Sequence, residues 1–475
     1  MTQTTAATLS VRNPRTGQPD YELPVHDAAQ VAAVARALRE AQPAWQDAGL
    51  PARLAAIAAF AEAILAGREG LVAALTADTG RRRESVMEVD AMVATLRRWI
   101  NDAPELLADA SPRRSQIPHI LIEERKRPYP VAGVISPWNF PLILSLIDAV
   151  PALVAGCAVL VKPSEATSRF VPVLEQLIAT VPGLAAVLRF VTGAGATGEA
   201  VVRNSDVLCF TGSVRTGRRV GELAAQVFIP CHLELGGKDA AIVCADADIE
   251  LAVRALTFGS MVNAGQTCMS IERCYVHRSI HDRFAAALAE SVGRLRHCHP
   301  GLDDGELGPI IAAIQAPIVQ RHLEDAYAKG ARALTGGRLL KLGGGDWLEP
   351  TVLVDAGHDM AIVTEETFAA VLPLMPFDDE DDAIRLANDT VYGLSGCVFS
   401  RDVERARRIA GRLNAGAISI NDAALTGMVH DAPKQSFGHS GLGGSRMGKP
   451  SLQRFYRMQA FLINTGEPSP WWFGR

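Results

Sequence analysis

The chain has 475 residues, of which 48% are hydrophobic and 21% are charged, so it is long enough for two or three domains and too apolar to be largely disordered. Its formal net charge of -5 at pH 7 offers no basic surface for nucleic acid or for an anionic membrane, which predicts neither partner and favours a small molecule. The N-terminal sequence MTQTTAATLS resembles no signal peptide, and the eight cysteines form no CxxC pair, so we expect a cytoplasmic protein.

The first predicted elements are helices between Ala28 and about Ile100. This stretch is rich in alanine and has apolar residues at helical spacing. Pro43 and Pro51 are expected to divide it, because proline has no N–H to donate within a helix. Residues 142–161 then form an apolar run of membrane-spanning length, but a charge and two helix breakers interrupt it. We predict a buried helix followed by a buried strand there.

Two segments do not fit this pattern of helices and buried strands. Residues 114–131 and 453–466 alternate apolar and charged side chains, as half-exposed strands do. Exposed strand edges favour pairing with another chain, so one interpretation is an arm that builds an oligomer. The other interpretation is a hairpin that packs on its own subunit. Trp471, Trp472 and Phe473 are costly to leave in water, and we expect them to dock on a neighbouring subunit.

From residue 131 onward, short apolar runs alternate with helical stretches. Runs rich in Val, Ile and Leu are typical of parallel sheets that are covered by helices on both faces. The expected strands are VAGVI at 131, AVLVK at 158, LRFV at 188, DVLCF at 206, HLEL at 232, AAIV at 240, RCYVH at 273, GCVF at 396 and GAISIN at 416. We therefore predict two α/β domains that meet near Gly236 and Gly237.

Polar side chains follow two of these strands. Asn139 lies between two prolines in PWNFP, which fixes where its amide points. Lys162 ends the strand in VLVKPSE, and Glu165 follows a proline turn. Because ligands bind at the carboxyl ends of parallel strands, this pair suits the hydroxyls of an adenosine ribose; the alternative is a surface ion pair. A 2′-phosphate would meet the like charge of Glu165, so NAD is preferred and NADP is the second candidate.

Two glycine-rich loops compete for the cofactor phosphates. VTGAGATGEA contains Gly193, Gly195 and Gly198 in the G-x-G-x-x-G spacing, but no acidic residue closes a second strand about twenty residues later. FTGSVRTG, at 210–217, also places a helix N-terminus after a strand, where backbone N–H groups favour phosphate. The residues alone leave both loops open as the phosphate site.

Cys268 in NAGQTCMS stands out among the cysteines, because it lies where a helical stretch gives way to a loop. Cysteines in or beside apolar strand runs behave as small hydrophobes; these are Cys157, Cys209, Cys231, Cys244 and Cys274. Glu234, at the end of a predicted strand with two glycines behind it, could reach a cleft between the domains. His297, Cys298 and His299 lack further ligands at zinc spacing, so we expect no metal site.

The motifs PWNFP, VLVKPSE, FTGSVRTG, LELGGK, NAGQTC and EETF, in this order, resemble those of the NAD(P)-dependent aldehyde dehydrogenase superfamily. The resemblance covers nearly the whole chain. It implies two doubly wound α/β domains and a small β arm. The cofactor domain would comprise 1–113 and 132–236, the catalytic domain 237–450, and the oligomerisation arm and tail 114–131 and 451–475. It also implies a homodimer or homotetramer.

The resemblance further implies a role for each matching residue. Cys268 matches the nucleophile, Glu234 the general base and Asn139 the oxyanion donor. The residues that match the cofactor site are Ser136, Trp138, Lys162, Ser164, Glu165, Phe210, Gly212, Ser213, Gly217, Leu235, Gly236, Glu366 and Phe368. In this family the pyrophosphate lies over the helix after FTGS, which would make GAGATG a connecting loop and helix start. Ala369 and Ala370 depart from the usual Gly-Pro, which changes the backbone freedom of the loop that grips the nicotinamide.

The reaction implied is the oxidation of an aldehyde to its carboxylic acid. The thiolate adds to the carbonyl, the oxyanion accepts hydrogen bonds from the Asn139 amide and the Cys268 N–H, and hydride leaves to NAD(P). Glu234 then activates the water that hydrolyses the thioacyl enzyme, which favours hydrolysis over acyl transfer to coenzyme A. A cofactor-independent cysteine esterase or hydrolase is one alternative, although these motifs lack a histidine base. An inactive binding protein is the other.

The residues around the thiol predict an apolar substrate tunnel. They are Phe140, Ile143, Leu144, Val262, Thr267 and Met269. They favour an aliphatic or aromatic aldehyde, and the lack of Arg or Lys among them argues against a dicarboxylic semialdehyde, which is the alternative within the family. The competing interpretation is that the apolar side chains are ordinary core. The loop 423–433 matches the region that shapes the tunnel mouth in the family, and His430 is expected to be exposed there.

Overall fold

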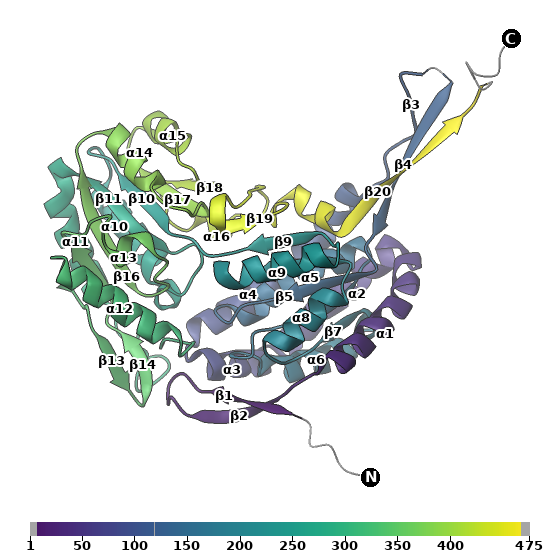
Figure 1. Cartoon of the computed structure of the whole chain (residues 1–475), viewed down its shortest axis with the longest axis horizontal. Coiled ribbons are helices and arrows are strands. Elements are labelled where there is room, and N and C mark those ends of the chain that lie inside the picture. The colour runs from purple at the N-terminus through teal and green to yellow at the C-terminus, as the bar shows by residue number, and fades with distance from the viewer. Residues whose placement is uncertain (1–6, 118, 467–475) are drawn as a thin grey trace.

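The computed structural model describes residues 7–117 and 119–466 and arranges them as two α/β lobes with a protruding arm (Figure 1). A hairpin comes first, made of β1 (Thr8–Arg12) and β2 (Pro19–Pro24). Four helices follow it, namely α1 (Ala28–Asp47), α2 (Gly49–Ala66), α3 (Arg68–Thr79) and α4 (Arg83–Leu107). The helical interpretation of this stretch is therefore confirmed.

The two prolines expected to divide the helical stretch behave differently. Pro43 lies inside α1 and does not break it, so that expectation was wrong. The nearby Trp45 is buried and its indole N–H donates to the Leu153 carbonyl at 2.9 Å. Such tertiary contacts outweigh the loss of one intrahelical hydrogen bond. Pro51 lies in the first turn of α2, where no intrahelical partner for an N–H exists.

The first sheet has six strands in the order β19-β9-β8-β5-β6-β7. Their bounds are β5 (Val131–Ile135), β6 (Ala158–Lys162), β7 (Leu188–Phe190), β8 (Val207–Thr211), β9 (Cys231–Glu234) and β19 (Gly441–Leu442). All neighbours are parallel except β9 and β19. The chain runs outward from β5 to β7 and returns to β8 on the other side of β5. A reversal of this kind opens a crevice at the carboxyl ends of the strands.

Helices cover both faces of this sheet. One face carries α5 (Pro141–Ala155) with α2 and α4 behind it, and the return crossover places α8 (Gly195–Arg203) and α9 (Val214–Gln226) on the other face with α1. Two shorter helices, α6 (Phe170–Ala179) and α7 (Leu184–Val187), adjoin β7. Every residue of β5, β6 and β8 is buried, which explains their continuous apolar sequences. By length and composition α2 could cross a bilayer; here it packs against α4, α5 and α6.

The second sheet has seven strands in the order β12-β15-β16-β11-β10-β17-β18. Only β12 and β15 are antiparallel neighbours. The strands are β10 (Asp239–Val243), β11 (Ile271–His277), β12 (Arg332–Thr335), β15 (Thr351–Val354), β16 (Val371–Phe377), β17 (Ser395–Phe399) and β18 (Ala417–Ile420). The α-helices of this part are α10 (Ile249–Met261), α11 (His281–Gly293), α12 (Gln315–Ala328), α13 (Ala361–Thr364), α14 (Glu380–Asn388), α15 (Val403–Ala410) and α16 (Leu425–Met428). A separate hairpin joins β13 (Leu339–Leu342) and β14 (Gly345–Leu348).

Each sheet has its own apolar core, and the chain passes from one core to the other between Leu235 and Ala240. β19 then returns from the second lobe to pair with β9 of the first sheet. The α/β class of the fold, with two mainly parallel sheets, is confirmed. We propose the domain boundary at Gly236 and Gly237, with residues 441–442 completing the sheet of the first domain.

The arm is a three-stranded antiparallel sheet that extends away from the two lobes (Figure 1). It consists of β3 (Arg113–Arg114), β4 (Ile120–Pro128) and β20 (Tyr456–Asn464). Residues 457–464 are all exposed, including Leu462 at 71%. The two predicted segments therefore pair with each other and leave a surface uncovered. Residues 471–473 of the aromatic tail lie outside the described part of the chain.

Candidate active site

A cleft of about 860 Å³ lies where the order of the first sheet reverses. Its walls come from the segments after β5, β6, β8 and β9, from α8 and α9, and from the second lobe. The predicted residues that line it are Ser136, Trp138, Asn139, Leu144, Lys162, Ser164, Glu165, Phe210, Gly212, Ser213, Leu235, Gly236, Cys268, Glu366 and Phe368. Gly217 lies behind Leu235 in α9, where an added Cβ would stand 2.5 Å from the leucine side chain. The topology thus gathers motifs that are far apart in the sequence.

The loop before Cys268 contains three consecutive left-handed residues. Asn263, Ala264 and Gly265 have φ values of 54°, 54° and 72°. The first two are unfavourable for residues that carry a Cβ, so contacts must hold the loop. The Asn263 amide donates to the carbonyl of Asn139 at 3.1 Å. The loop leaves the Cys268 side chain half-buried and facing the cleft.

The amide of Asn139, the predicted oxyanion donor, is held beside this loop. Asn139 is 3% exposed, and its Nδ2 donates to the carbonyl of Gln266 at 3.0 Å. Gln266 is itself anchored, because its side chain donates to the Pro309 carbonyl at 3.1 Å and accepts from the Ile311 N–H at 2.9 Å. Since Nδ2 carries two hydrogens, the second one is available to a group in the cleft.

A buried ion pair that the sequence analysis missed supports both segments. The Arg81 and Glu88 side chains are 1% and 0% exposed and lie 3.3 Å apart. Arg81 donates to the carbonyl of Asn139 at 2.7 Å and to the side chain of Asn263. Glu88 accepts two backbone N–H groups of the first turn of α5, and burial raises its pKa to about 7. Three arginines stand in a row at 81–83, and no local signal shows which one is buried.

The thiol of Cys268 is mainly protonated at neutral pH. Burial raises its pKa to about 11. The charges of Asp239 and Glu234 also raise this pKa, whereas those of Lys434 and Arg446 lower it. Because the thiolate is the nucleophile, burial and these four charges together determine the reactivity of the sulfur.

Glu234, the predicted general base, is the last residue of β9. The two residues after it line the cleft, whereas Glu234 itself is half-buried at its edge. Its carboxylate accepts a hydrogen bond from Ser436 Oγ at 3.0 Å and acts electrostatically on the thiol of Cys268. The Ser436 contact was not predicted, since it joins residues 202 positions apart.

The segments after β6 and β8 carry groups that suit a dinucleotide. The Lys162 ammonium donates to the Pro163 carbonyl at 2.9 Å and lies 3.3 Å from the carboxylate of Glu165, which is 49% exposed. Burial lowers the pKa of Lys162. Ser213 caps α9 by accepting from the Thr216 N–H at 3.3 Å, which leaves the first N–H groups of this helix facing the cleft.

Glycines allow the backbone to come close to neighbouring groups in this cleft. A Cβ on Gly212 would lie 2.6 Å from the ring of Phe210, and one on Gly236 would overlap the carboxylate of Glu366. The second glycine loop borders the cleft too, because Gly195 and its helix α8 lie beside α9. The residues of the cleft therefore fit a phosphate-bearing cofactor. They offer N–H donors for the phosphates, and the glycines allow the backbone to come close to the ligand.

The loop that carries Glu366 and Phe368 is held by a second buried ion pair. The Lys238 and Glu272 side chains are 1% and 3% exposed and lie 2.6 Å apart. Glu272 accepts the two backbone N–H groups that follow Glu366, at 2.7 and 2.8 Å. Phe368 packs edge-on against Trp138, with the ring centres 5.4 Å apart. Burial raises the pKa of Glu366 to about 8. The sequence analysis identified neither Lys238 nor Glu272.

The alanines that replace the usual Gly-Pro are tightly packed. Ala369 and Ala370 are 2% and 0% exposed. Their backbone runs against the nucleophile loop so closely that a Cβ on Gly265 would overlap the carbonyl of Ala369. The loop of Glu366 and the loop of Cys268 are therefore in direct backbone contact, so a shift of one loop would displace the other.

The predicted tunnel residues occupy different places. Leu144 lines the cleft. The others are half-buried outside its lining, namely Phe140, Ile143, Val262, Thr267 and Met269. The ring of Phe140 lies 5.2 Å from the Arg81 guanidinium carbon. Phe140 therefore also supports the oxyanion loop.

Lys434 is a further group near the thiol that the sequence analysis did not identify. Its ammonium donates to the sulfur of Met269, the residue after the nucleophile, at 3.1 Å. The contact joins positions that are 165 residues apart, so no local sequence pattern predicts it. His430, in the preceding loop, is half-buried rather than exposed, with its Nδ1 3.3 Å from the Met447 sulfur.

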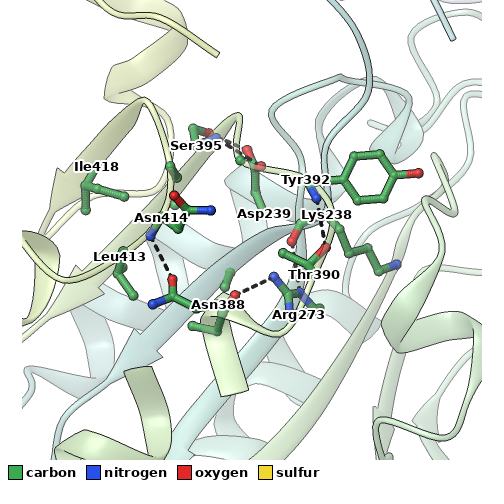
Figure 2. A pocket seen from close by; sticks show the side chains of 15 residues that line it. Lys238, Asp239, Arg273, Asn388, Thr390, Tyr392, Ser395, Leu413, Asn414 and Ile418 are labelled. Carbon is green, nitrogen blue, oxygen red and sulfur yellow. Dashed lines mark hydrogen bonds between the residues drawn. The ribbon is translucent and has the colours of Figure 1, made fainter. Parts of the chain in front are cut away.

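A smaller pocket of about 20 Å³ lies at the amino ends of β10, β17 and β18 (Figure 2). In it, Asp239 faces Ser395 and accepts its backbone N–H at 3.0 Å. Burial raises the pKa of Asp239 to about 7. The volume is that of a single water, so this pocket does not fit a substrate.

Across residues 7–117 and 119–466, no three His, Cys, Asp or Glu side chains are grouped to hold a metal ion. In the cluster at 297–299, His297 Nε2 lies 2.9 Å from the Leu348 carbonyl, and the Cys298 sulfur lies beside the guanidinium of Arg15. All eight cysteines are free thiols.

Comparison with known proteins gives one consistent family. Residues 1–461 match the model of the aldehyde dehydrogenase family. A glutarate-semialdehyde dehydrogenase of Pseudomonas putida is 35% identical over 448 residues, which cover 93% of this chain and 92% of that protein. The solved structure of a candidate aldehyde dehydrogenase, PutA, from Anabaena variabilis has a TM-score of 0.97 and 50% identity, with 98% and 100% of the two chains covered. The betaine aldehyde dehydrogenase of Staphylococcus aureus, solved with NAD+, has a TM-score of 0.92 and 31% identity, with 99% and 94% covered.

Proposed function

Because the chain belongs to the aldehyde dehydrogenase family, we propose that it oxidises an aldehyde to the carboxylic acid through a covalent thioester on Cys268. The observation that carries the proposal is that Cys268 and Asn139 face the same cleft as the groups that suit a dinucleotide. The apolar side chain of Leu144, which lines the cleft together with Cys268, favours an aliphatic or aromatic aldehyde.

The sulfur and the amide act in the first half of the reaction. After Cys268 loses its proton, its sulfur adds to the carbonyl carbon, and the carbonyl oxygen becomes negatively charged. The second hydrogen of Asn139 Nδ2 donates to this oxygen, a contribution typically worth about 10²–10³ in rate. A bound nicotinamide would supply the acceptor for the hydride of this carbon, and Glu366 and Phe368, which line the same cleft, would hold it. An acyl group then remains on Cys268 as a thioester.

Glu234 acts in the second half. Its carboxylate takes a proton from the water that attacks the thioester, because neutral water is a weak nucleophile. Ser436 holds that carboxylate at 3.0 Å and so orients it. The acid is released and the thiol is restored.

NAD is the cofactor that the charges favour. The exposed carboxylate of Glu165 next to Lys162 can accept from a ribose hydroxyl but would repel a 2′-phosphate. The two buried ion pairs hold the loops that carry Asn139 and Glu366 through hydrogen bonds to their backbones. A ratio of kcat/KM for NAD over NADP well above one supports this preference, and a ratio below one contradicts it.

We further propose that the arm builds a homodimer or homotetramer and that the protein works in the cytoplasm. The exposed side chains of residues 457–464 support the assembly. The eight free cysteines suit a reducing compartment.

Replacing Cys268 with Ala tests the reaction. We expect the native protein to form NADH from a panel of simple aldehydes, and the variant to lose at least about three orders of magnitude in kcat. A parallel assay follows cofactor-free hydrolysis of an activated ester. Ester hydrolysis without any NADH formation would support a cysteine hydrolase instead, and activity in neither assay would support a binding protein.

A further inference from the structure

Thr367, the residue after Glu366, ties its loop to the interior of the second lobe. Its side chain is completely buried, and each of its polar groups has a partner. The N–H donates to Glu272 at 2.7 Å, and the carbonyl accepts from the side chain of Gln315 at 2.6 Å. The hydroxyl oxygen accepts from the Lys238 ammonium at 3.2 Å. The place of this loop in the cleft therefore depends on the partners of Thr367.

A buried histidine connects the hydroxyl of Thr367 to the protein surface. His322, in α12, is 0% exposed. Its Nδ1 lies 3.1 Å from Thr367 Oγ1, and its Nε2 lies 3.2 Å from the carboxylate of Glu365. Glu365 is exposed and also accepts from the Arg321 guanidinium at 2.8 Å. A chain of contacts therefore runs from Lys238 in the interior, through Thr367 and His322, to the surface.

The partners of His322 assign the hydrogen on its ring. A carboxylate can only accept hydrogen bonds, so Nε2 carries the hydrogen and donates it to Glu365. Nδ1 is then an acceptor, and it takes the hydroxyl hydrogen of Thr367. The oxygen of that hydroxyl remains free to accept from Lys238. The neutral imidazole thus satisfies every group of the chain, in one direction from the ammonium to the carboxylate.

A protonated His322 would lose this arrangement. Both nitrogens of an imidazolium are donors, so Nδ1 could no longer accept from the hydroxyl. Lys238 on the inner side and Arg321 on the same helix are cations that face the ring, and the carboxylate of Glu365 opposes them. Asp325, also in α12, interacts with the ring through its charge. Burial lowers the pKa of His322, and the charge of Lys238 lowers it further. The ring is therefore neutral at neutral pH.

We propose that neutral His322 is a positioning residue for NAD, because it accepts the hydroxyl of Thr367 and so holds the loop whose Glu366 and Phe368 line the cleft. His322 itself lies outside the lining of the cleft, so it acts on the cofactor only through Thr367. The inference rests on the proposed use of NAD in this cleft and is independent of which aldehyde is oxidised. It adds that protonation of one buried imidazole weakens cofactor binding.

The first test removes the hydroxyl and keeps the shape of the side chain. Thr367→Val should raise the Kd for NAD, measured by calorimetry without aldehyde, by about fivefold to tenfold, since one net hydrogen bond to the loop is lost. Thr367→Ser keeps the hydroxyl and should stay within about twofold of the native Kd by the same reasoning. At saturating NAD, kcat for a simple aliphatic aldehyde should change by less than about threefold in both variants.

The second test uses pH to separate positioning from packing. The oxygen of an asparagine can occupy the place of Nδ1, so His322→Asn keeps an acceptor for Thr367 and gains no proton. As the pH falls from about 7 to about 5, the native Kd for NAD should rise about twofold or more, because the neutral ring is lost below its pKa. The Kd of His322→Asn should not follow this rise. Glu366 titrates in every variant, so its contribution cancels in the comparison. His322→Asn also carries the test if Thr367→Val does not fold.

His358→Asn is the matched control. His358 also bridges a hydroxyl and a carboxylate, with Nε2 2.9 Å from Tyr275 Oη and Nδ1 2.9 Å from Asp389, but it lies outside the lining of the cleft. It should leave the Kd for NAD and its pH profile unchanged. Equal losses of affinity in Thr367→Val and Thr367→Ser, or the same native Kd at pH 5 and pH 7, would overturn the inference while leaving NADH formation intact. A native protein that does not bind NAD at any pH would overturn the proposed function as well.

Discussion

At the thiol of Cys268, four charged side chains act in opposite directions on one pKa. Asp239 and Glu234 raise it together with burial, and Lys434 and Arg446 lower it. The result, about 11, lies far above neutral pH. The sulfur is therefore kept mainly unreactive, and any positive charge that is brought into the cleft will favour its thiolate.

This pKa predicts a steep pH dependence for alkylation of the sulfur. Below a raised pKa the thiolate fraction increases tenfold with each pH unit, so the rate of inactivation by iodoacetamide without cofactor should rise about tenfold per unit from about pH 7 to 10. Mass spectrometry of the peptide that contains Cys268 reports the labelling, and Cys268→Ala serves as the unlabelled control. A plateau of the rate below about pH 9 would contradict the raised pKa.

Glu234 should be needed only after the hydride has left. For Glu234→Gln we expect one rapid turnover of NADH per active site, followed by a steady rate that is lower by about two orders of magnitude, since a general base typically contributes 10²–10⁴. Stopped-flow absorbance at the NADH band separates the two phases. Ser436→Ala should show a smaller fall, because Ser436 only orients the carboxylate. A steady rate equal to that of the native enzyme would exclude Glu234 as the base.

At the level of elements, two loops from the second lobe hold each other in place. The nucleophile loop contains left-handed residues, and the loop of Glu366 presses its Ala369 carbonyl against Gly265. Each loop is tied to the rest of the molecule by a buried ion pair. Removing one partner of such a pair typically costs about 3–5 kcal/mol, so these ties explain how strained backbone persists.

Gly265→Ala should therefore impair both stability and activity. The new methyl group would overlap the backbone of Ala369 at a φ of 72°, and overpacking of this kind typically costs about 1–3 kcal/mol. We expect a lower thermal unfolding midpoint and a raised KM for NAD. Gly330→Ala is the matched control, since Gly330 has a φ of 100° with no atom within 4 Å of an added Cβ. If both variants lose the same amount of thermal stability and of activity, the positive backbone angle is responsible and not the contact with Ala369.

At the level of the whole molecule, the arm is much more exposed to solvent than the sheets of the two lobes. The sheets are covered on both faces, whereas β20 is exposed along residues 457–464 and includes Met458 at 56% and Leu462 at 71%. Exposed apolar patches of this kind mark interaction sites. The shape in Figure 1, with the arm projecting beyond the lobes, suits contact with a second copy of the chain.

A charge placed on the arm should disperse the assembly. Leu462→Asp is expected to shift the mass measured by light scattering from an oligomer toward the monomer, because an aspartate would be desolvated in the interface. Leu334→Asp, on the edge strand β12 at 41% exposure, should leave the mass unchanged. A native protein that is already monomeric would instead favour the interpretation of the arm as a local hairpin.

Much of the fold followed from local pattern. The continuous apolar runs of β5, β6 and β8 are buried strands as expected, because a strand covered on both faces needs no polar side. The helix over Pro43 was predicted wrongly, since the contact of Trp45 with Leu153 lies outside any local window.

The sequence by itself determined the α/β class, nine strands of the two sheets, the family and the motifs around the cleft, because buried runs, glycine turns and short motifs are local properties. It did not predict β12, β15 and β16 of the second sheet or the two separate hairpins. Only the tertiary structure decided which arginine of residues 81–83 is buried, that β19 completes the first sheet, and that Lys434 meets Met269. These features join residues that are far apart in the chain, and burial and charge depend on which side chains the fold brings into contact.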